Sequence, residues 1–139
     1  MYPPRILKKL QDCHQAGGKI FYFVPDLTAT QQDARWPAVL GQFCQKYSHQ
    51  PHCLLINLKN AGSDNQAQIQ YLQQFLGQFP QRPAIIFAIS QDGIVLELLK
   101  LADYFITTKE AISSKGIDYM ETFGGQMLSG LEYNIFANI

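Results

Sequence analysis

The chain of 139 residues has the length of one domain, and 47% of its residues are hydrophobic, enough to fill one core. Eleven basic and eleven acidic side chains give no formal net charge, which excludes the concentrated positive charge needed to bind nucleic acid or a membrane surface. No stretch approaches the ~20 apolar residues of a membrane span, no secretory signal is visible, and the three cysteines form no C-x-x-C motif. We therefore expect a single domain over residues 1–139 in a reducing, cytoplasmic setting, with no nucleic-acid partner and no membrane span.

Five apolar runs predict the strands. Four have the β-branched or aromatic content of buried strands, and a fifth, near the C-terminus, is weaker: Lys19–Val24, Cys53–Asn57, Ala84–Ile89, Tyr104–Thr107 and Gln126–Ser129. The runs lack the period-two alternation of a half-exposed strand. Continuous apolar runs are typical of strands covered on both faces, as in parallel sheets.

Segments with helical spacing of their apolar residues precede and separate these runs. The first helix is expected over about residues 4–16, ending at Gly17 and Gly18. The apolar stripes of four later helices are Trp36, Val39, Leu40, Phe43 and Tyr47; Ile69, Leu72, Phe75, Leu76 and Phe79; Ile94, Val95, Leu98, Leu99 and Leu101; and Ile112, Ile117, Met120 and Phe123. Ser63 with Gln66, and Thr107 with Glu110, match the S/T-x-x-E/Q capping box, which predicts two helix N-termini.

The spacing of these elements predicts the fold class. Strand starts lie roughly 20 to 35 residues apart, the span of a right-handed βαβ crossover. Five βα units from about residue 19 to residue 136 predict a three-layer, doubly wound α/β domain with a mostly parallel five-stranded sheet, Rossmann-like or flavodoxin-like. No helix is evident after the fifth strand, so either the N-terminal helix or a partner chain is expected to cover that face.

In open parallel sheets, ligands bind beyond the carboxyl ends of the strands. The loops expected there supply the candidate ligand-binding residues Asp26, Thr28, Asp92, Thr107, Thr108, Lys109, Ser129 and Gly130. The amides of residues 108–110, at a predicted helix N-terminus, suit a phosphate, and Lys109 adds positive charge. Asp26 and Asp92 suit the hydroxyls of a sugar or ribose, and Gly130 allows close backbone approach. Each of these residue types also suits a helix cap or a tight turn.

Motifs of several well-known chemistries are missing from the sequence. No G-x-G-x-x-G follows the first strand, where Pro25 and Asp26 stand, and neither G-x-x-x-x-G-K-[ST] nor G-x-S-x-G occurs. The sequence therefore indicates no cofactor and assigns no catalytic residue. His49 and His52 have H-x-x-H spacing, but they precede the second strand, at the sheet edge away from the expected crevice. We expect a solvated loop there and no metal site.

Two other α/β families match the site loops in part. Asp26, Asp92 and Thr107 or Thr108 correspond loosely to the acidic and hydroxyl residues of receiver-like phosphoacceptor domains, but Ser129 stands where a lysine is expected. A flavodoxin-like flavin site needs a glycine-containing phosphate loop after the first strand, and residues 26–30 contain two threonines and no glycine. Both families remain alternatives.

Several segments of the second half are more distinctive: ADYFITT (102–108), SS (113–114), IDY (117–119) and LSGLEYNIF (128–136). Together with the opening IFYFVPD (20–26), they resemble a domain of bacterial proteins of surface-polysaccharide assembly, often found beside or within glycosyltransferases. The resemblance covers residues 84–136 and, more loosely, residues 19–47. It implies that the ligand is a nucleotide-activated sugar or a glycan.

The chain departs from glycosyltransferases in two respects. The metal-binding Asp-x-Asp of the commonest single-domain enzymes is missing, Asp26-Leu27-Thr28 being the nearest string, and the chain is much shorter than a complete transferase. We therefore expect a domain that recognises a nucleotide-sugar or glycan and works beside a catalytic partner chain. If the domain is itself an enzyme, the resemblance implies a glycosyltransferase-like one.

The apolar C-terminal segment, residues 133–139, favours an alternative of another class. If exposed, it would form a patch for a partner such as a second copy in a twofold dimer, and the domain would be an interaction or regulatory module without enzymatic activity. Tyr133 and Phe136 fit a terminal apolar anchor, with stacking on a base or sugar as the other reading. Trp36 lies in a helical stripe, which favours core packing over an interface role.

Overall fold

The computed structural model describes residues 4–25, 27, 35–90, 96–107, 125–130 and 132–137. These residues contain one sheet of five strands, and every neighbouring pair is parallel. The strands are β1 (Ile20–Phe23), β2 (Cys53–Lys59), β3 (Ala84–Ser90), β4 (Tyr104–Thr107) and β5 (Gln126–Ser129). All five strands predicted from the apolar runs are confirmed, including the weakest.

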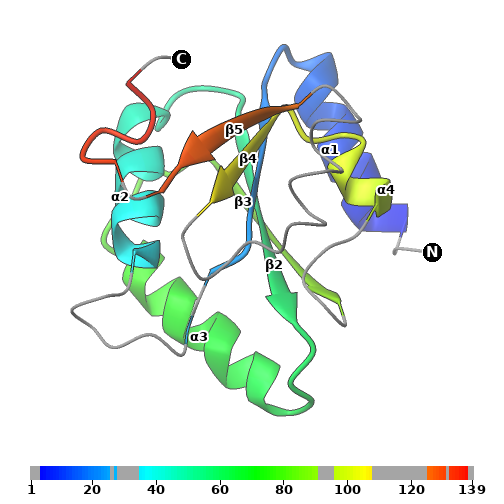
Figure 1. The fold of residues 1–139 in the computed structure, drawn as a ribbon, viewed down its shortest axis with the longest axis vertical. Coiled ribbons are helices and arrows are strands. Elements are labelled where there is room, and N and C mark those ends of the chain that lie inside the picture. The colour runs from blue at the N-terminus through cyan, green and yellow to red at the C-terminus, as the bar shows by residue number, and fades with distance from the viewer. Residues whose placement is uncertain are drawn as a thin grey trace.

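The order of the strands, β3-β2-β1-β4-β5, determines where a ligand crevice forms (Figure 1). From β1 the chain moves outward to β2 and then β3. It then crosses back, and β4 pairs with the other side of β1, with Phe21 opposite Tyr104. This is the order of Rossmann-type sheets, whereas flavodoxin-type sheets have the order 2-1-3-4-5. The predicted three-layer α/β class is confirmed, and the strand order changes direction between β1 and β4.

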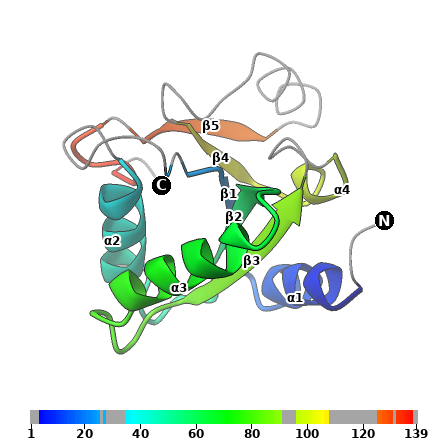
Figure 2. The ribbon, with the colours of Figure 1, turned by 90° about the horizontal axis from the view of Figure 1, so that it is seen from below.

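Helices cover both faces of the sheet (Figure 2). They are α1 (Pro4–Gln15), α2 (Trp36–Lys46), α3 (Asp64–Leu76) and α4 (Leu96–Leu99). One hydrophobic cluster joins α2 and α3 to the sheet, and a second joins α1 and α4 to the opposite face. The sheet is therefore the middle of three layers.

Strand β1 shows why its sequence is apolar throughout. All four of its residues are buried. Phe21 and Phe23 belong to the cluster with α2 and α3, whereas Ile20 and Tyr22 belong to the cluster with α1 and α4. Because successive side chains point to opposite faces, a strand covered on both sides needs apolar residues at every position.

Helix α1 packs on the same face of the sheet as α4. Leu10 and Cys13 lie in the same cluster as Ile20 of β1. The turn that closes α1 contains Gly17, which has φ +83°. The Gly18 N–H donates to the Cys13 carbonyl oxygen at 2.9 Å, as in a Schellman motif. The predicted stop at Gly17 and Gly18 is confirmed.

The capping box predicted at Ser63 is wrong. Ser63 is the N-cap residue of α3, but its side chain makes no capping hydrogen bond. The buried side chain of Asn65 holds this loop instead: its Oδ1 accepts from the Ala61 N–H at 2.8 Å, and its Nδ2 donates to the Lys59 carbonyl oxygen at 3.0 Å. An Asn inside the first turn therefore satisfies the loop backbone.

The third predicted helix is represented by the single turn of α4, and residues 94 and 95 of its stripe lie outside the described residues. The fourth predicted helix, over residues 112–123, and Glu110 of the second capping box also lie outside them. Within the part of the chain that the structure describes, no helix combines the length and apolar character needed to cross a membrane.

Candidate functional site

The candidate site lies at the edge of the sheet where the strands end, hereafter the carboxyl edge. β1 and β4 end side by side there, with Phe23 opposite Ile106. Ile56 of β2 is the register partner of Phe23, and β2 continues for three residues beyond it. At this edge, β1 is therefore shorter than β2. In doubly wound sheets, ligands bind where the strand order changes direction, and here that change falls between β1 and β4.

Three of the candidate residues are brought together at this edge. Thr107 at the end of β4 is the register partner of Ser129 at the end of β5. The N–H of Gly130, the next residue, donates to the Thr107 carbonyl oxygen at 2.6 Å. Thr107 is half-buried, Ser129 is exposed and Gly130 is buried. The remaining candidates lie outside the described residues: Asp26, Thr28, Asp92, Thr108 and Lys109.

A buried polar network at the same edge was missed by the sequence reasoning. Asn57 of β2 is fully buried, its Nδ2 donates to the Tyr22 hydroxyl of β1, and its Oδ1 accepts from the Ser90 hydroxyl of β3 at 3.0 Å. The network thus links the carboxyl-terminal parts of three neighbouring strands, on the face covered by α1 and α4. A polar residue at the same phase in each of three apolar strands was the signal that could have revealed it.

The network consists of two hydroxyls and an amide, which exchange hydrogen bonds without changing charge. Because hydrogen bonds are stronger in a buried environment and each partner left alone is costly, Asn57 fixes the relative positions of its two neighbours. Asn57 itself has no exposed surface. It therefore acts as a buried support for the carboxyl edge.

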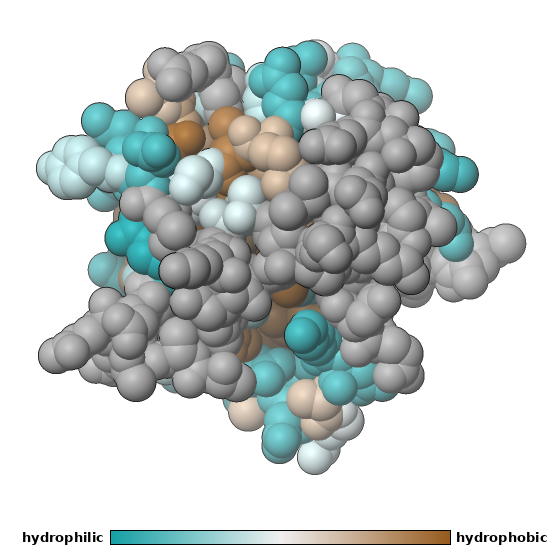
Figure 3. Space-filling model, viewed as in Figure 1, coloured by the Kyte–Doolittle hydropathy of each residue, from teal (hydrophilic) through white to brown (hydrophobic). Residues whose placement is uncertain are grey.

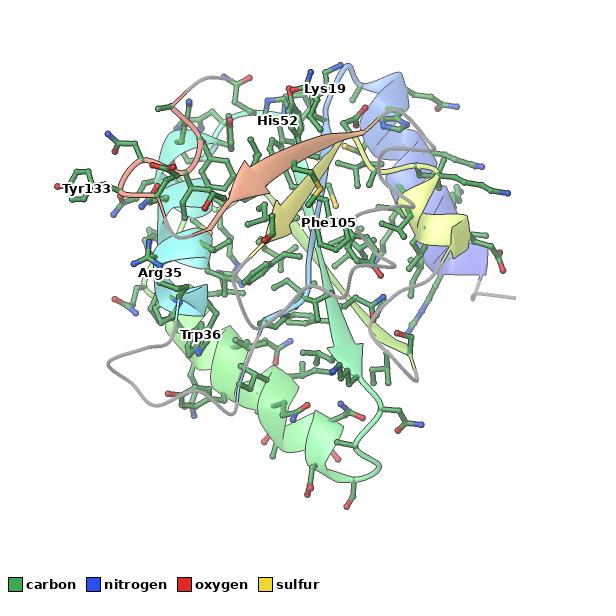
Figure 4. All side chains as sticks on the ribbon, viewed as in Figure 1. Lys19, Arg35, Trp36, His52, Phe105 and Tyr133 are labelled. Carbon is green, nitrogen blue, oxygen red and sulfur yellow. The ribbon has the colours of Figure 1, made fainter. Side chains whose placement is uncertain are left out.

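Arg35, at the N-cap of α2, ties this helix to the loop after β5. Its Nε donates to the Gly130 carbonyl oxygen at 2.9 Å and its guanidinium also donates to the Glu132 carbonyl oxygen at 3.1 Å. The next residue, Trp36, is buried and its ring lies 5.1 Å from that of Phe75 (Figure 4). The core role predicted for Trp36 is confirmed. The beginning of α2 is thus fixed to both α3 and the β5 loop.

The opposite edge, where the strands begin, is here called the amino edge. Asp103 Oδ2 accepts from the Ile20 N–H and lies beside His14 Nε2, both at 2.8 Å. His52 Nδ1 accepts from the Lys19 N–H, also at 2.8 Å (Figure 4). These side chains connect α1 and the loops before β1, β2 and β4. Their partners are mainly backbone groups, which indicates a structural role.

The solvated loop predicted for His49 and His52 is only half right. His49 is exposed, but His52 is half-buried and its ring lies 4.6 Å from that of Tyr47. Burial, and then the positive charge of Lys19, lower the pKa of His52, and its Nδ1 is occupied by a backbone donor. Among the described residues, no group of three His, Cys, Asp or Glu side chains could hold a metal ion.

The three cysteines are buried free thiols. Burial raises the pKa of Cys44 to about 11 and that of Cys53 to about 12, and it also raises the pKa of Cys13. Because the thiolate is the reactive form, these thiols are poor nucleophiles. They pack as small apolar side chains.

The C-terminal apolar segment behaves in two ways. Phe136 is buried, 5.5 Å from the ring of Phe21, as expected for an anchor, and Ile135 is buried beside it. Tyr133 is 88% exposed and projects away from the molecule (Figure 4), so the anchor role predicted for it is wrong. A stacking role for Tyr133 remains a prediction.

Comparisons of the chain with models of protein families, with curated proteins and with solved structures gave no match.

Proposed function

We propose that the domain binds a nucleotide-sugar at the carboxyl edge of the sheet and works beside a catalytic partner chain. The observation that carries this proposal is the change of direction in the strand order between β1 and β4. Parallel sheets with this order bind nucleotide-containing ligands where it reverses, because the loops on either side diverge there and leave a crevice.

The residues described at this edge support the proposal. The hydroxyls of Thr107 and Ser129 stand on neighbouring strands. The buried Asn57 network fixes β1, β2 and β3 relative to one another. Hydroxyls are suitable partners for sugar and ribose hydroxyls, since both can donate and accept hydrogen bonds. This arrangement favours recognition over proton transfer.

A thermal-shift screen tests the proposal. The protein is melted with UDP, GDP, CMP and their sugars, and with FMN as the flavin alternative. A ligand present at 100 times its dissociation constant stabilises the folded state by ~2.7 kcal/mol, which raises the Tm measurably. We expect a shift specific to one base. A shift with FMN alone, or no shift with any nucleotide, contradicts the proposal.

Two matched substitutions then locate the site. Ser129 and Gln126 are exposed residues at opposite ends of β5. Ser129→Trp places a bulky ring at the carboxyl edge and should abolish the ligand-induced shift. Gln126→Trp adds the same ring at the amino edge and should leave the shift intact. Equal responses of the two variants would exclude the carboxyl edge as the site.

A further inference from the structure

The two outermost strands of the sheet differ in length and in exposed chemistry. They lie at opposite ends of the sheet (Figure 2). β5 has four residues, with Gln126 and Ser129 exposed at its ends, and in the view of Figure 3, which faces β5, hydrophobic atoms (brown) form only small areas among the coloured atoms. β3 has seven residues, none of them charged and none proline. Short edge strands, charges and prolines keep sheet edges from pairing with another chain, and β3 has none of these protections.

The backbone groups of alternate β3 residues point away from the sheet. The Asn60 N–H donates to the Ser90 carbonyl oxygen at 2.6 Å, so Ser90 directs its backbone groups toward β2. Because successive residues of a strand direct their N–H and C=O groups to opposite sides, Phe87 and Ile85 direct theirs outward. Outside the ladder with β2, no hydrogen bond joins the backbone of these two residues to the rest of the described chain. The outer edge of β3 therefore offers hydrogen-bonding groups to a further strand.

The side chains of β3 add apolar surface at this edge. Ile85 and Phe87 are only half-buried against the cluster of α2 and α3, and Ile89, at the same phase of the strand, is 41% exposed. Ile86 and Ala88 are buried in the cluster on the other face. A further strand would cover the exposed part of the first three side chains. Apolar burial would then add to the hydrogen bonds.

The order of residues along β3 matches that of a second, antiparallel copy. When two copies pair about Phe87, each Phe87 faces the other, Ile85 faces Ile89, and Ile86 faces Ala88. Each of these contacts joins two apolar side chains, and none brings charges together. The outward backbone groups of the two Phe87 residues also meet, so that they exchange two hydrogen bonds. A register shifted by one residue would instead set these groups against a residue that already bonds to β2.

We propose that the outer edge of β3 is an interaction surface for a second copy of this chain, and that the two β3 strands pair about a twofold axis at Phe87. A strand that is its own complement is what such an axis requires, since each residue must face its counterpart on the other copy. The charges permit the approach, because α3, which packs beside β3, has Asp64 as its one charged residue. The contact is separated from Thr107 and Ser129 by β2 and β1, so it is independent of the proposed ligand site.

Exchanging charges at Phe87 tests this register. Phe87→Lys and Phe87→Glu each place like charges opposite one another, so each should dimerise more than about tenfold more weakly than the wild type by analytical ultracentrifugation. Their mixture places opposite charges together and should form a heterodimer. Tyr71 is exposed on α3, and its ring lies 5.4 Å from that of Trp36 in α2. Tyr71→Lys and Tyr71→Glu are therefore the controls and should dimerise like the wild type.

Cysteine cross-linking gives a second measurement with a smaller change of side chain. In the proposed pair, the two Cα atoms at position 87 lie about 5.5 Å apart, within the range of a disulfide, so Phe87→Cys should form a covalent dimer on oxidation. Ile85→Cys alone should not, because its two copies lie about 14 Å apart, but it should link to Ile89→Cys when the two are mixed. The native thiols are buried and do not compete.

Three results would overturn the proposal. The first is a wild-type protein that stays monomeric at every concentration. The second is a dimer that Phe87→Lys and Phe87→Glu leave intact. The third is a Phe87→Cys protein that cross-links no better than Ile85→Cys.

Discussion

The two edges of the sheet are built for different tasks. At the amino edge, charged and imidazole side chains such as Asp103 and His52 bind backbone groups and lock the strand starts together. At the carboxyl edge, neutral groups dominate the described residues: a buried amide, hydroxyls and a glycine. The same strands therefore begin in a locked junction and end at an edge where the described groups are mainly neutral. Changes at the amino edge should cost stability alone, whereas changes at the carboxyl edge should also alter ligand binding.

The largest effect is expected from Gly18→Ala at the amino edge. A Cβ at this position would lie 2.1 Å from the Pro51 carbonyl oxygen and 2.9 Å from Cys13 Sγ, so the backbone between α1 and β2 would have to move. We expect a loss of about 3 kcal/mol in the free energy of unfolding, measured by urea denaturation. The control is Gly62→Ala, where φ is +64° but no atom lies within 4 Å, and about 1 kcal/mol should be lost. Equal losses would contradict the tight junction.

Asn57→Ala should show most clearly that changes at the two edges have different effects. It leaves the Tyr22 and Ser90 hydroxyls without the amide that joins them, and we expect a loss of about 2 kcal/mol. Unlike Gly18→Ala, it should also weaken the nucleotide-sugar response measured by thermal shift. Asn60→Ala, which removes only the exposed hydrogen bond from the Gly62 N–H to Asn60 Oδ1 (3.0 Å), should cost about 0.5 kcal/mol. If the Asn57→Ala protein responds to the ligand like the wild type, the network does not contribute to the site.

Tyr47→Phe should stabilise the protein. The Tyr47 hydroxyl is buried and has no hydrogen-bond partner among the described residues, and burial raises the pKa of Tyr47 to about 12. Removing an unsatisfied hydroxyl should raise the free energy of unfolding by about 1 kcal/mol. Tyr71→Phe, at an exposed ring, should leave the stability unchanged. A destabilised Tyr47→Phe would show that the hydroxyl has a partner after all.

The smallest effect concerns pH and His52. Its pKa is lowered in the folded state, so the unfolded chain binds a proton more readily than the folded one. Stability should therefore fall as the pH drops below about 6.5, the ordinary histidine pKa. His52→Asn keeps a side-chain acceptor and should reduce the difference in Tm between pH 7.5 and pH 5.5. The exposed His49, changed to Asn in the same way, should leave that difference as it is.

Local sequence predicts the elements of this fold but not their long-range pairing. The apolar runs identify the strands because a strand covered on both faces is mainly apolar, as β1 is, and the weakest run corresponds to β5, whose ends are exposed. The position of β4 beside β1 does not follow from any local pattern, since crossovers of similar length lead to either side of a sheet. The Asn57 network depends on the pairing of β2 with β1 and β3 and on the register of these three strands, and for that reason it was missed.

Local chemistry also misleads where two residues compete for the same backbone groups. Ser63 has the spacing of a capping box, but Asn65 binds the loop from inside the helix. Tyr133 and Phe136 belong to one apolar run. Only the path of residues 132–137 along α2 decides that Phe136 is buried and Tyr133 is exposed. Of the candidate site, Thr107, Ser129 and Gly130 were placed correctly at one edge because strand ends are predictable.

Mapping backbone amide shifts by NMR during titration with the nucleotide-sugar that gives the largest Tm shift tests the central claim most directly. The largest changes should fall on Thr107, Ser129 and Gly130. Changes concentrated instead at Lys19, Asp103 and Gln126, which line a hollow of about 310 Å³ at the amino edge, would place the ligand at the wrong end of the strands and contradict the account.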